Sequence, residues 1–203
     1  YTSLDPASYG TIGTIYDLTI QAEGKTLTSR TKIPNPVYFD SIWYERGENQ
    51  DSLGFVWVEM DDPDTIGNSY KWFAQRINHY TYGPQQGEIK DAQPIAPLGS
   101  IFDDKFFNGQ RFEFAYNRGE LGNYEGQDDE GPEEGYFKDG DTVVVKFISL
   151  DRANYFYYRA FEDQVATNGS PFATAGNLPT NIDGGFGVFS GHGVAFDTVV
   201  CTP

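Results

Sequence analysis

Thr142-Val143-Val144-Val145-Lys146-Phe147-Ile148-Ser149-Leu150 is a near-continuous apolar run that follows a turn at positions 138–141. Its β-branched and aromatic residues favour an extended conformation. A strand with one solvated face alternates apolar and polar residues, whereas a strand buried on both faces does not. The run therefore predicts a central strand of a sheet.

A single helix is expected directly after this strand, over about 151–167. Asp151 is a residue type that caps helix N-termini, since its carboxylate accepts hydrogen bonds from free backbone N–H groups. Apolar residues then recur at the spacing of one helix face, and Asn168-Gly169 is a stop signal.

Short alternating segments bounded by turn residues occupy much of the remaining chain and predict further strands. The first two, at 14–21 and 25–33, flank the Glu23-Gly24 turn and form a hairpin. The others lie at 37–44, 53–60, 68–77, 110–116, 185–190 and 193–200. Residues 68–77 are expected to pair with 53–60. Many short strands with one helix and long loops predict an all-β protein, an immunoglobulin-like β-sandwich.

The three tryptophans are expected in the core of that sandwich. Trp43, Trp57 and Trp72 each lie on an alternating segment. Core filling is the ordinary fate of such large aromatic side chains.

A domain boundary is expected in Ile33-Pro34-Asn35-Pro36. Each proline restricts its own φ angle and the residue before it, so this segment is a rigid linker. The chain then divides into residues 1–35 and residues 36–203, the latter being the main sandwich domain.

The balance of charge excludes several partners. The 203 residues include 14 Lys and Arg against 30 Asp and Glu, for a formal net charge of −16. DNA, RNA and anionic lipid surfaces are bound through Lys and Arg, so none of them is an expected partner. Cations, neutral glycans and other proteins are compatible with the charge. Cys201 is the only cysteine, so neither an intrachain disulfide nor a thiolate metal cage can form.

No pattern of residues predicts catalysis. The two histidines, His79 and His192, are expected in surface turns, and neither a GxSxG nor an HExxH motif is present. A glycosidase needs two carboxylates facing across a cleft, and no spacing among the 30 acidic residues favours such a pair. We therefore expect a protein that is not an enzyme and has no cofactor.

Calcium is the ion whose ligands the sequence offers, since it binds carboxylate, carbonyl and amide oxygens. One turn supplies such donors from Asp61, Asp62, Asp64 and Asn68. A second acidic segment has six Asp or Glu among positions 125–134. Neither matches the EF-hand loop. The alternative for both is a solvated polar turn that ends a strand.

Two loops and one helix are candidate contact surfaces. The loops are the acidic, glycine-rich segment 118–140 and the weakly periodic segment 78–100. Consecutive aromatic residues at 155–158 circle the helix, so not all of them can face one core. The residues expected to contact a partner are Glu125, Asp128, Asp129, Glu130, Tyr155 and Tyr158. Exposed tyrosines are also compatible with a carbohydrate-binding surface module, which is the alternative function.

Five segments in order carry a resemblance to a known family. They are PVYFDSIW at 36–43, FDDKFFNGQ at 102–110, DGDTV at 139–143, PF at 171–172 with NLPTNI at 177–182, and GGFGVF at 184–189. Together they resemble a family of Bacteroidota outer-membrane lipoproteins that is filed as a domain of unknown function. The genes of that family commonly lie beside those of TonB-dependent receptors.

The resemblance spans roughly 13–200 and implies a place and a partner rather than catalytic residues. It implies a non-enzymatic accessory lipoprotein at the cell surface that associates with a TonB-dependent β-barrel in the outer membrane and assists substrate capture or assembly. Members of the family carry an N-terminal lipid anchor and a first β-sandwich domain. Residues 1–35 are therefore expected to be the last strands of such a domain, with the anchor outside this chain.

The same resemblance implies O-glycosylation, since exported Bacteroidota proteins are modified at Asp-Ser or Asp-Thr followed by an aliphatic residue. Asp51-Ser52-Leu53 and Asp64-Thr65-Ile66 match this pattern in expected turns, whereas other matches begin strands. Ser52 and Thr65 are therefore the expected glycosylation sites.

Overall fold

The structure is a computed structural model that describes residues 10–48, 50–83, 85–119, 135–167 and 176–202. Within these residues the chain forms eleven strands and one helix. They are β1 (Ile15–Ala22), β2 (Lys25–Lys32), β3 (Ser41–Arg46), β4 (Leu53–Asp61), β5 (Ser69–Arg76), β6 (Ile101–Asp103), β7 (Arg111–Tyr116), β8 (Phe137–Lys138), β9 (Thr142–Leu150), α1 (Arg152–Thr167), β10 (Ile182–Asp183) and β11 (His192–Val200).

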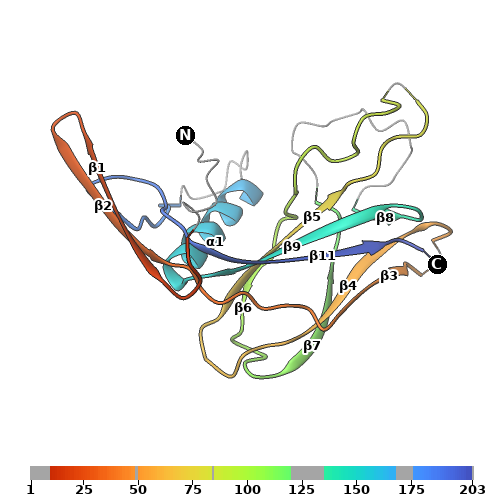
Figure 1. The fold of residues 1–203 in the computed structure, drawn as a ribbon, viewed down its shortest axis with the longest axis horizontal. Helices are drawn as coiled ribbons and strands as arrows, with labels where there is room; N and C mark the ends of the chain where they lie inside the picture. Colours follow the sequence, from red (N-terminus) through yellow and green to blue (C-terminus); the bar gives the residue numbers. More distant parts are fainter. Residues whose placement is uncertain (1–9, 49, 84, 120–134, 168–175, 203) are drawn as a thin grey trace.

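Two antiparallel sheets pack against each other as a β-sandwich (Figure 1). One sheet has the strand order β3-β4-β7, with β8 paired to β4, and the other has the order β11-β9-β5-β6. Side chains from both sheets fill the space between them, among them the fully buried Val56, Trp72 and Phe147. The all-β sandwich that the sequence predicts is confirmed.

β9 is the central strand that its sequence predicts, because it lies between β11 and β5. Its first residues alternate between buried and half-buried, whereas Phe147, Ile148, Ser149 and Leu150 are all buried. The pattern changes because α1 packs on the outer surface of this sheet. Tyr155 of the helix shares an apolar cluster with Ile148 and Leu150. Both faces of β9 are covered there, which explains the continuous apolar run.

Asp151 caps α1 as predicted and also fastens the helix to β2. Its Oδ1 accepts a hydrogen bond from the Asn154 backbone N–H at 2.9 Å. Its Oδ2 accepts a hydrogen bond from the Thr31 hydroxyl at 2.8 Å. The Thr31 oxygen in turn accepts one from the Asn154 side-chain amide at 3.0 Å. One polar cluster therefore satisfies the helix terminus and holds the hairpin against it.

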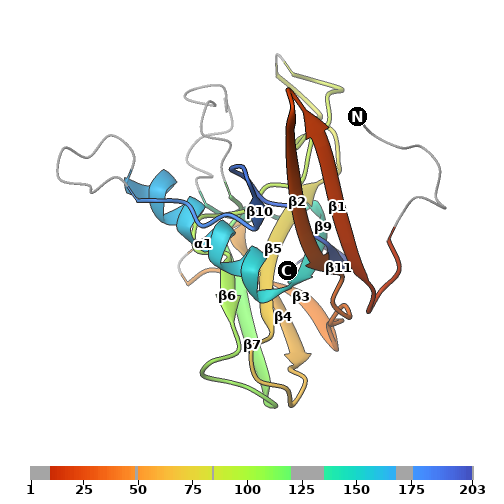
Figure 2. The ribbon, with the colours of Figure 1, turned by 90° about the vertical axis from the view of Figure 1, so that its left-hand side faces the viewer.

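β1 and β2 form the predicted hairpin, in a small sheet of order β1-β2-β10. Glu23 and Gly24 in its turn have φ angles of 51° and 75°, as a two-residue hairpin turn of the primed type requires. The hairpin projects away from the sandwich on the side where α1 lies, and β10 lies beside it (Figures 1 and 2). That residues 1–35 are part of an incomplete first domain stays a prediction.

Two expectations about the strands are wrong. β5 does not pair with β4, because residues 62–68 cross to the opposite sheet, where β5 pairs with β6 and β9. Residues 185–190 form no strand, and the strand that precedes β11 is the two-residue β10. Gly184 and Gly187 have positive φ angles of 80° and 131°, which interrupt a regular strand.

Trp43 and Trp57 do not lie in the core, which corrects a further expectation. Both are half-buried, and the residues beside them, Tyr44, Val56 and Val58, are the buried ones. Successive side chains of a strand point to opposite faces, so the two tryptophans lie on the outer face of the β3-β4-β7 sheet. Trp72 alone among the three is buried as predicted.

The long segment 78–100 is fastened to the sandwich by buried ion pairs. Arg76 lies 2.9 Å from Asp91, with side chains only 3% and 5% exposed. Lys90 lies 2.9 Å from Asp141. Ile95 adds a backbone bridge to Ala74 of β5. These contacts carry the end of the segment, residues 96–98, to the edge of the surface on which α1 lies.

Candidate binding groove

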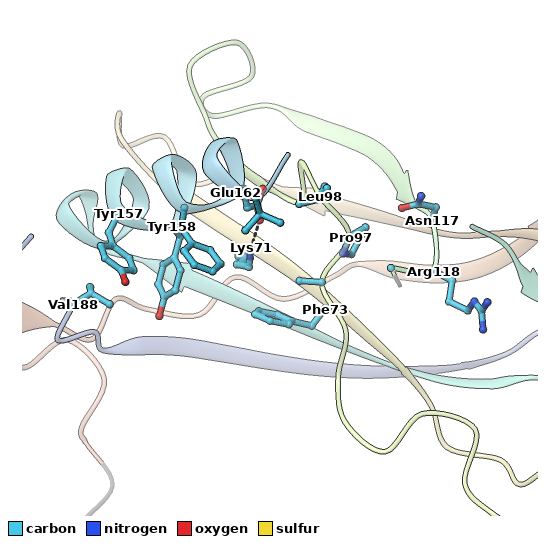
Figure 3. A pocket seen from close by; sticks show the side chains of 14 residues that line it. Lys71, Phe73, Pro97, Leu98, Asn117, Arg118, Tyr157, Tyr158, Glu162 and Val188 are labelled. Carbon is cyan, nitrogen blue, oxygen red and sulfur yellow. Dashed lines mark hydrogen bonds and ion pairs between the residues drawn. The ribbon is translucent and has the colours of Figure 1, made fainter. Parts of the chain in front are cut away.

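An open groove of about 860 Å³ lies between α1, the outer face of β5 and the loops at 96–98 and 117–119. Its wall on the helix side consists of Tyr157, Tyr158, Phe161 and Val165, and Phe73 contributes from β5. Figure 3 shows Tyr157 and Tyr158 extending from the helix, with Phe73 to their right. Apolar and aromatic side chains with few polar groups are typical of ligand pockets of this size.

An ion pair between Lys71 and Glu162 crosses the groove (dashed line in Figure 3). Both side chains are about nine-tenths buried, at 10% and 9% exposure. The second carboxylate oxygen of Glu162 accepts the Gly99 N–H at 3.0 Å. The Lys71 ammonium also lies 5.6 Å from the centre of the Phe73 ring. Because both charges are paired, they position the helix over the sheet and leave the groove without an unpaired charge at this point.

The rim of the groove carries apolar side chains that reach into solvent. Leu98 is 60% exposed, Phe161 48% and Val165 46%. A smaller hollow of about 440 Å³ adjoins the groove at Tyr157 and is lined in part by Leu178 and Phe186. Clustered exposed apolar side chains beside a concave surface mark a place where a partner removes them from water.

His192 and Cys201, two potentially reactive side chains outside the groove, are both held in their uncharged forms by burial. Burial lowers the pKa of His192 to about 4, with a further contribution from Lys146, so the imidazole is neutral at physiological pH. Burial also raises the pKa of the Cys201 thiol to about 12, so it stays protonated. Among the residues that the structure describes, no three His, Cys, Asp or Glu side chains gather as a metal site. The apolar and aromatic part of its lining suits the groove to binding apolar surface.

The four residues predicted as calcium ligands form a hydrogen-bonded turn. Asp62 is buried, and its two oxygens accept hydrogen bonds from the Tyr70 hydroxyl at 2.6 Å and the Gly109 N–H at 3.1 Å. Asp64 accepts one from the Asn108 side chain, and the Asn68 side-chain amide donates to backbone carbonyls of the turn. Asp61 ends β4 and is exposed. Three of the four side chains, Asp62, Asp64 and Asn68, therefore make hydrogen bonds within the protein, which fits the polar-turn alternative.

The expected glycosylation sites lie at the surface. Thr65 is exposed in the turn before β5, and Ser52 is half-buried just before β4. Each stands where the sequence predicts a turn, and their glycosylation stays a prediction.

The residues expected to contact a partner differ in their exposure to solvent. Tyr155 is 8% exposed and packs in the cluster beneath α1, so it offers no surface to a partner, which corrects that expectation. Tyr158 is half-buried and lines the groove. The four acidic residues of the predicted contact, Glu125, Asp128, Asp129 and Glu130, lie outside the described residues.

Lys71 and Phe161 are groove residues that sequence reasoning missed, and Leu98 lies in the segment 78–100, which it named only as a whole as a candidate contact surface. A local signal existed for one of them: Lys71 and Phe73 alternate with the core residue Trp72, which places them on the opposite face of β5. No local signal indicates that Leu98, from a loop without periodicity, comes to lie near that face.

Fold and groove together define an all-β sandwich protein with one helix on a sheet and an apolar groove beside the helix. Comparisons with known protein families, with curated proteins and with solved structures found no match. Within the described ranges, the helix is neither long nor apolar enough to cross a bilayer.

Proposed function

We propose that this protein is a non-enzymatic accessory lipoprotein of the outer-membrane surface, associated with a TonB-dependent β-barrel transporter, and that the groove beside α1 contacts this partner. The location, the lipid anchor and the kind of partner come from the sequence resemblance. The binding role rests on one structural observation, the apolar groove with its exposed rim.

The composition of the groove favours a protein partner with apolar side chains. Three rim residues, Leu98, Phe161 and Val165, expose about half or more of their surface. Covering them releases roughly 25 cal/mol for each Å² of apolar surface that leaves water. The Lys71–Glu162 pair in the groove is already satisfied, so a partner there needs no compensating charge.

The proposal is tested by capture of the native full-length protein from outer membranes in mild detergent, with mass spectrometry of what accompanies it. We expect a TonB-dependent barrel in near-stoichiometric amount. Leu98→Gln with Phe161→Gln should reduce its recovery severalfold, because glutamine keeps helix propensity but removes the apolar contacts.

The matched control is Phe106→Gln, which changes a phenylalanine that is 85% exposed and does not line the groove. This variant should capture the barrel as the wild type does. Recovery of the protein alone would refute the association with a transporter. Equal recovery by the groove variant and the wild type would refute the groove as the contact surface.

A further inference from the structure

Trp43 and Trp57 form a cross-strand pair on the outer face of the β3-β4-β7 sheet. They lie directly opposite each other in the register of β3 and β4. Their ring centres are 6.2 Å apart and the ring planes differ by only 16°. On the other side of Trp57 the register partner is Ala115 of β7, whose small side chain leaves the indole uncovered on that flank. The sheet therefore presents two nearly parallel indoles side by side.

This outer face of the sheet is at least partly exposed on all three strands. Its outward residues on the three strands are all exposed or half-buried, and none is buried. They are Ser41, Trp43 and Glu45 of β3, Leu53, Phe55, Trp57, Glu59 and Asp61 of β4, and Arg111, Glu113 and Ala115 of β7. Phe55, which packs against Tyr136, borders Trp57 along β4. Hydroxyl and carboxylate groups border the two indoles on their other sides.

The polar border is held in place by the protein itself. Arg111 donates a hydrogen bond to Glu59 at 2.6 Å, and the Ser41 hydroxyl donates to the same carboxylate at 3.3 Å. Glu45 and Glu113 are exposed on either side and have free acceptor capacity toward solvent. A rigid apolar surface with hydrogen-bond acceptors around it suits a ligand that is apolar on one face and hydroxylated at its edge.

We propose that this outer face is a binding site for neutral oligosaccharides, with Trp43 and Trp57 as the stacking platform. A pyranose ring turns C–H groups toward an aromatic face and hydroxyl groups toward the border, where Glu45 and Glu113 accept their hydrogen bonds. Charge selects among the possible occupants. A chain of net charge −16 repels uronate-rich or sulfated glycans and a second copy of itself. This site lies on a different sheet from the groove, and the proposal does not depend on the transporter association.

The test uses the purified protein with a panel of neutral hexasaccharides, namely cellohexaose, mannohexaose, xylohexaose and maltohexaose, and with hexagalacturonate as the anionic counterpart. Isothermal titration calorimetry should detect at least one neutral sugar and no galacturonate. Trp43→Ala and Trp57→Ala should each weaken that binding about tenfold or more. Phe106→Ala removes an aromatic ring that is 85% exposed and outside this face, and it should leave the affinity unchanged.

A second readout needs no variant. Trp72 is fully buried, so acrylamide quenching of tryptophan fluorescence in the wild type reports chiefly on Trp43 and Trp57. The bound hexasaccharide should protect these two indoles from acrylamide. The proposal is overturned if no neutral sugar binds, if sugars bind without protecting the indoles, or if sedimentation shows a dimer that protects them in the absence of sugar.

Discussion

His192 illustrates how burial changes the chemistry of a single side chain. Its Nε2 is buried without a hydrogen-bond partner, beside the Tyr158 ring at 6.2 Å between ring centres. A charged imidazolium in this place would lose its hydration and be repelled by the Lys146 cation, and the Asp151 carboxylate offsets only part of this cost. The fold therefore favours the neutral form of the imidazole, which packs beside the Tyr158 ring.

This burial predicts a loss of stability on acidification. The pKa of His192 is about 4 in the folded protein, against 6.5 for the free side chain. The unfolded chain therefore takes up a proton first, and stability should fall as the pH drops from about 6.5 toward 4, by at most about 3 kcal/mol from this residue. Urea unfolding at about pH 7 and about pH 4.5 measures the difference.

The comparison variant is His192→Gln, which cannot be protonated in this range. Carboxylates add their own pH dependence to both proteins, so the informative quantity is the difference between the two. The variant should lose less stability over the interval than the wild type. Equal losses would mean that His192 is solvated enough to take its proton in the folded state.

At the scale of the element, the position of α1 depends on two kinds of contact. Tyr155 packs on Ile148 and Leu150 at the end of β9, and Asp151 caps the helix while it binds the Thr31 hydroxyl. Further along, Glu162 binds both Lys71 of β5 and the Gly99 N–H. The helix α1 thus joins the hairpin, the β11-β9-β5-β6 sheet and the loop that forms the far side of the groove.

Breaking the buried ion pair should loosen this arrangement. Glu162→Gln removes the negative charge and leaves the Lys71 ammonium largely buried without its partner. We therefore expect the free energy of unfolding to fall by about 3 kcal/mol. The matched control is Asp163→Asn on the same helix, which breaks the exposed pair with Arg159, 3.6 Å long with side chains 51% and 67% exposed. That change should cost less than about 1 kcal/mol. Chemical denaturation of both variants measures their free energies of unfolding. Similar losses of stability in the two variants would contradict the stabilising role of the buried pair.

At the scale of the whole molecule, charge opposes the packing of the layers. In the described part of the chain, the two sheets of the sandwich and α1 pack around two apolar clusters, while the protein carries a net charge of −16. Ion pairs such as Arg76–Asp91 and Lys90–Asp141 use several of its few cations in buried positions. Most of the excess carboxylates therefore repel one another across the surface.

Salt should consequently stabilise the protein. Raising sodium chloride from about 20 to about 200 mM shortens the Debye length from roughly 20 to roughly 7 Å, which screens repulsion between surface carboxylates. The Tm from calorimetry should rise by a few degrees at neutral pH. The rise should shrink at about pH 4.5, where part of the carboxylates are protonated. A Tm that falls with salt would show that surface ion pairs outweigh the net repulsion.

Local pattern predicted most of the elements. The hairpin, β4, β7, β9 and the single helix with its Asp151 cap follow from periodicity and from residues with one favoured role. The partner of β5 was not predicted by the local pattern. The sequence of β5 alternates as that of a β4 partner would. Residues 62–68 cross to the other sheet, however, and there β5 pairs with β9. The groove was not predictable either, since it joins α1 to loops such as 96–98 that have no period of their own.

By itself, the sequence determined that this is an acidic all-β protein with one helix, because strand and helix formation depend on neighbours a few residues away. Only the tertiary structure decided which faces are buried. β3 and β4 carry large apolar side chains at both alternate positions, so alternation alone does not tell which set turns inward. The opposing sheet buries Tyr44, Val56 and Val58 and leaves Trp43 and Trp57 on the outer face, since a face is buried only when another layer covers it.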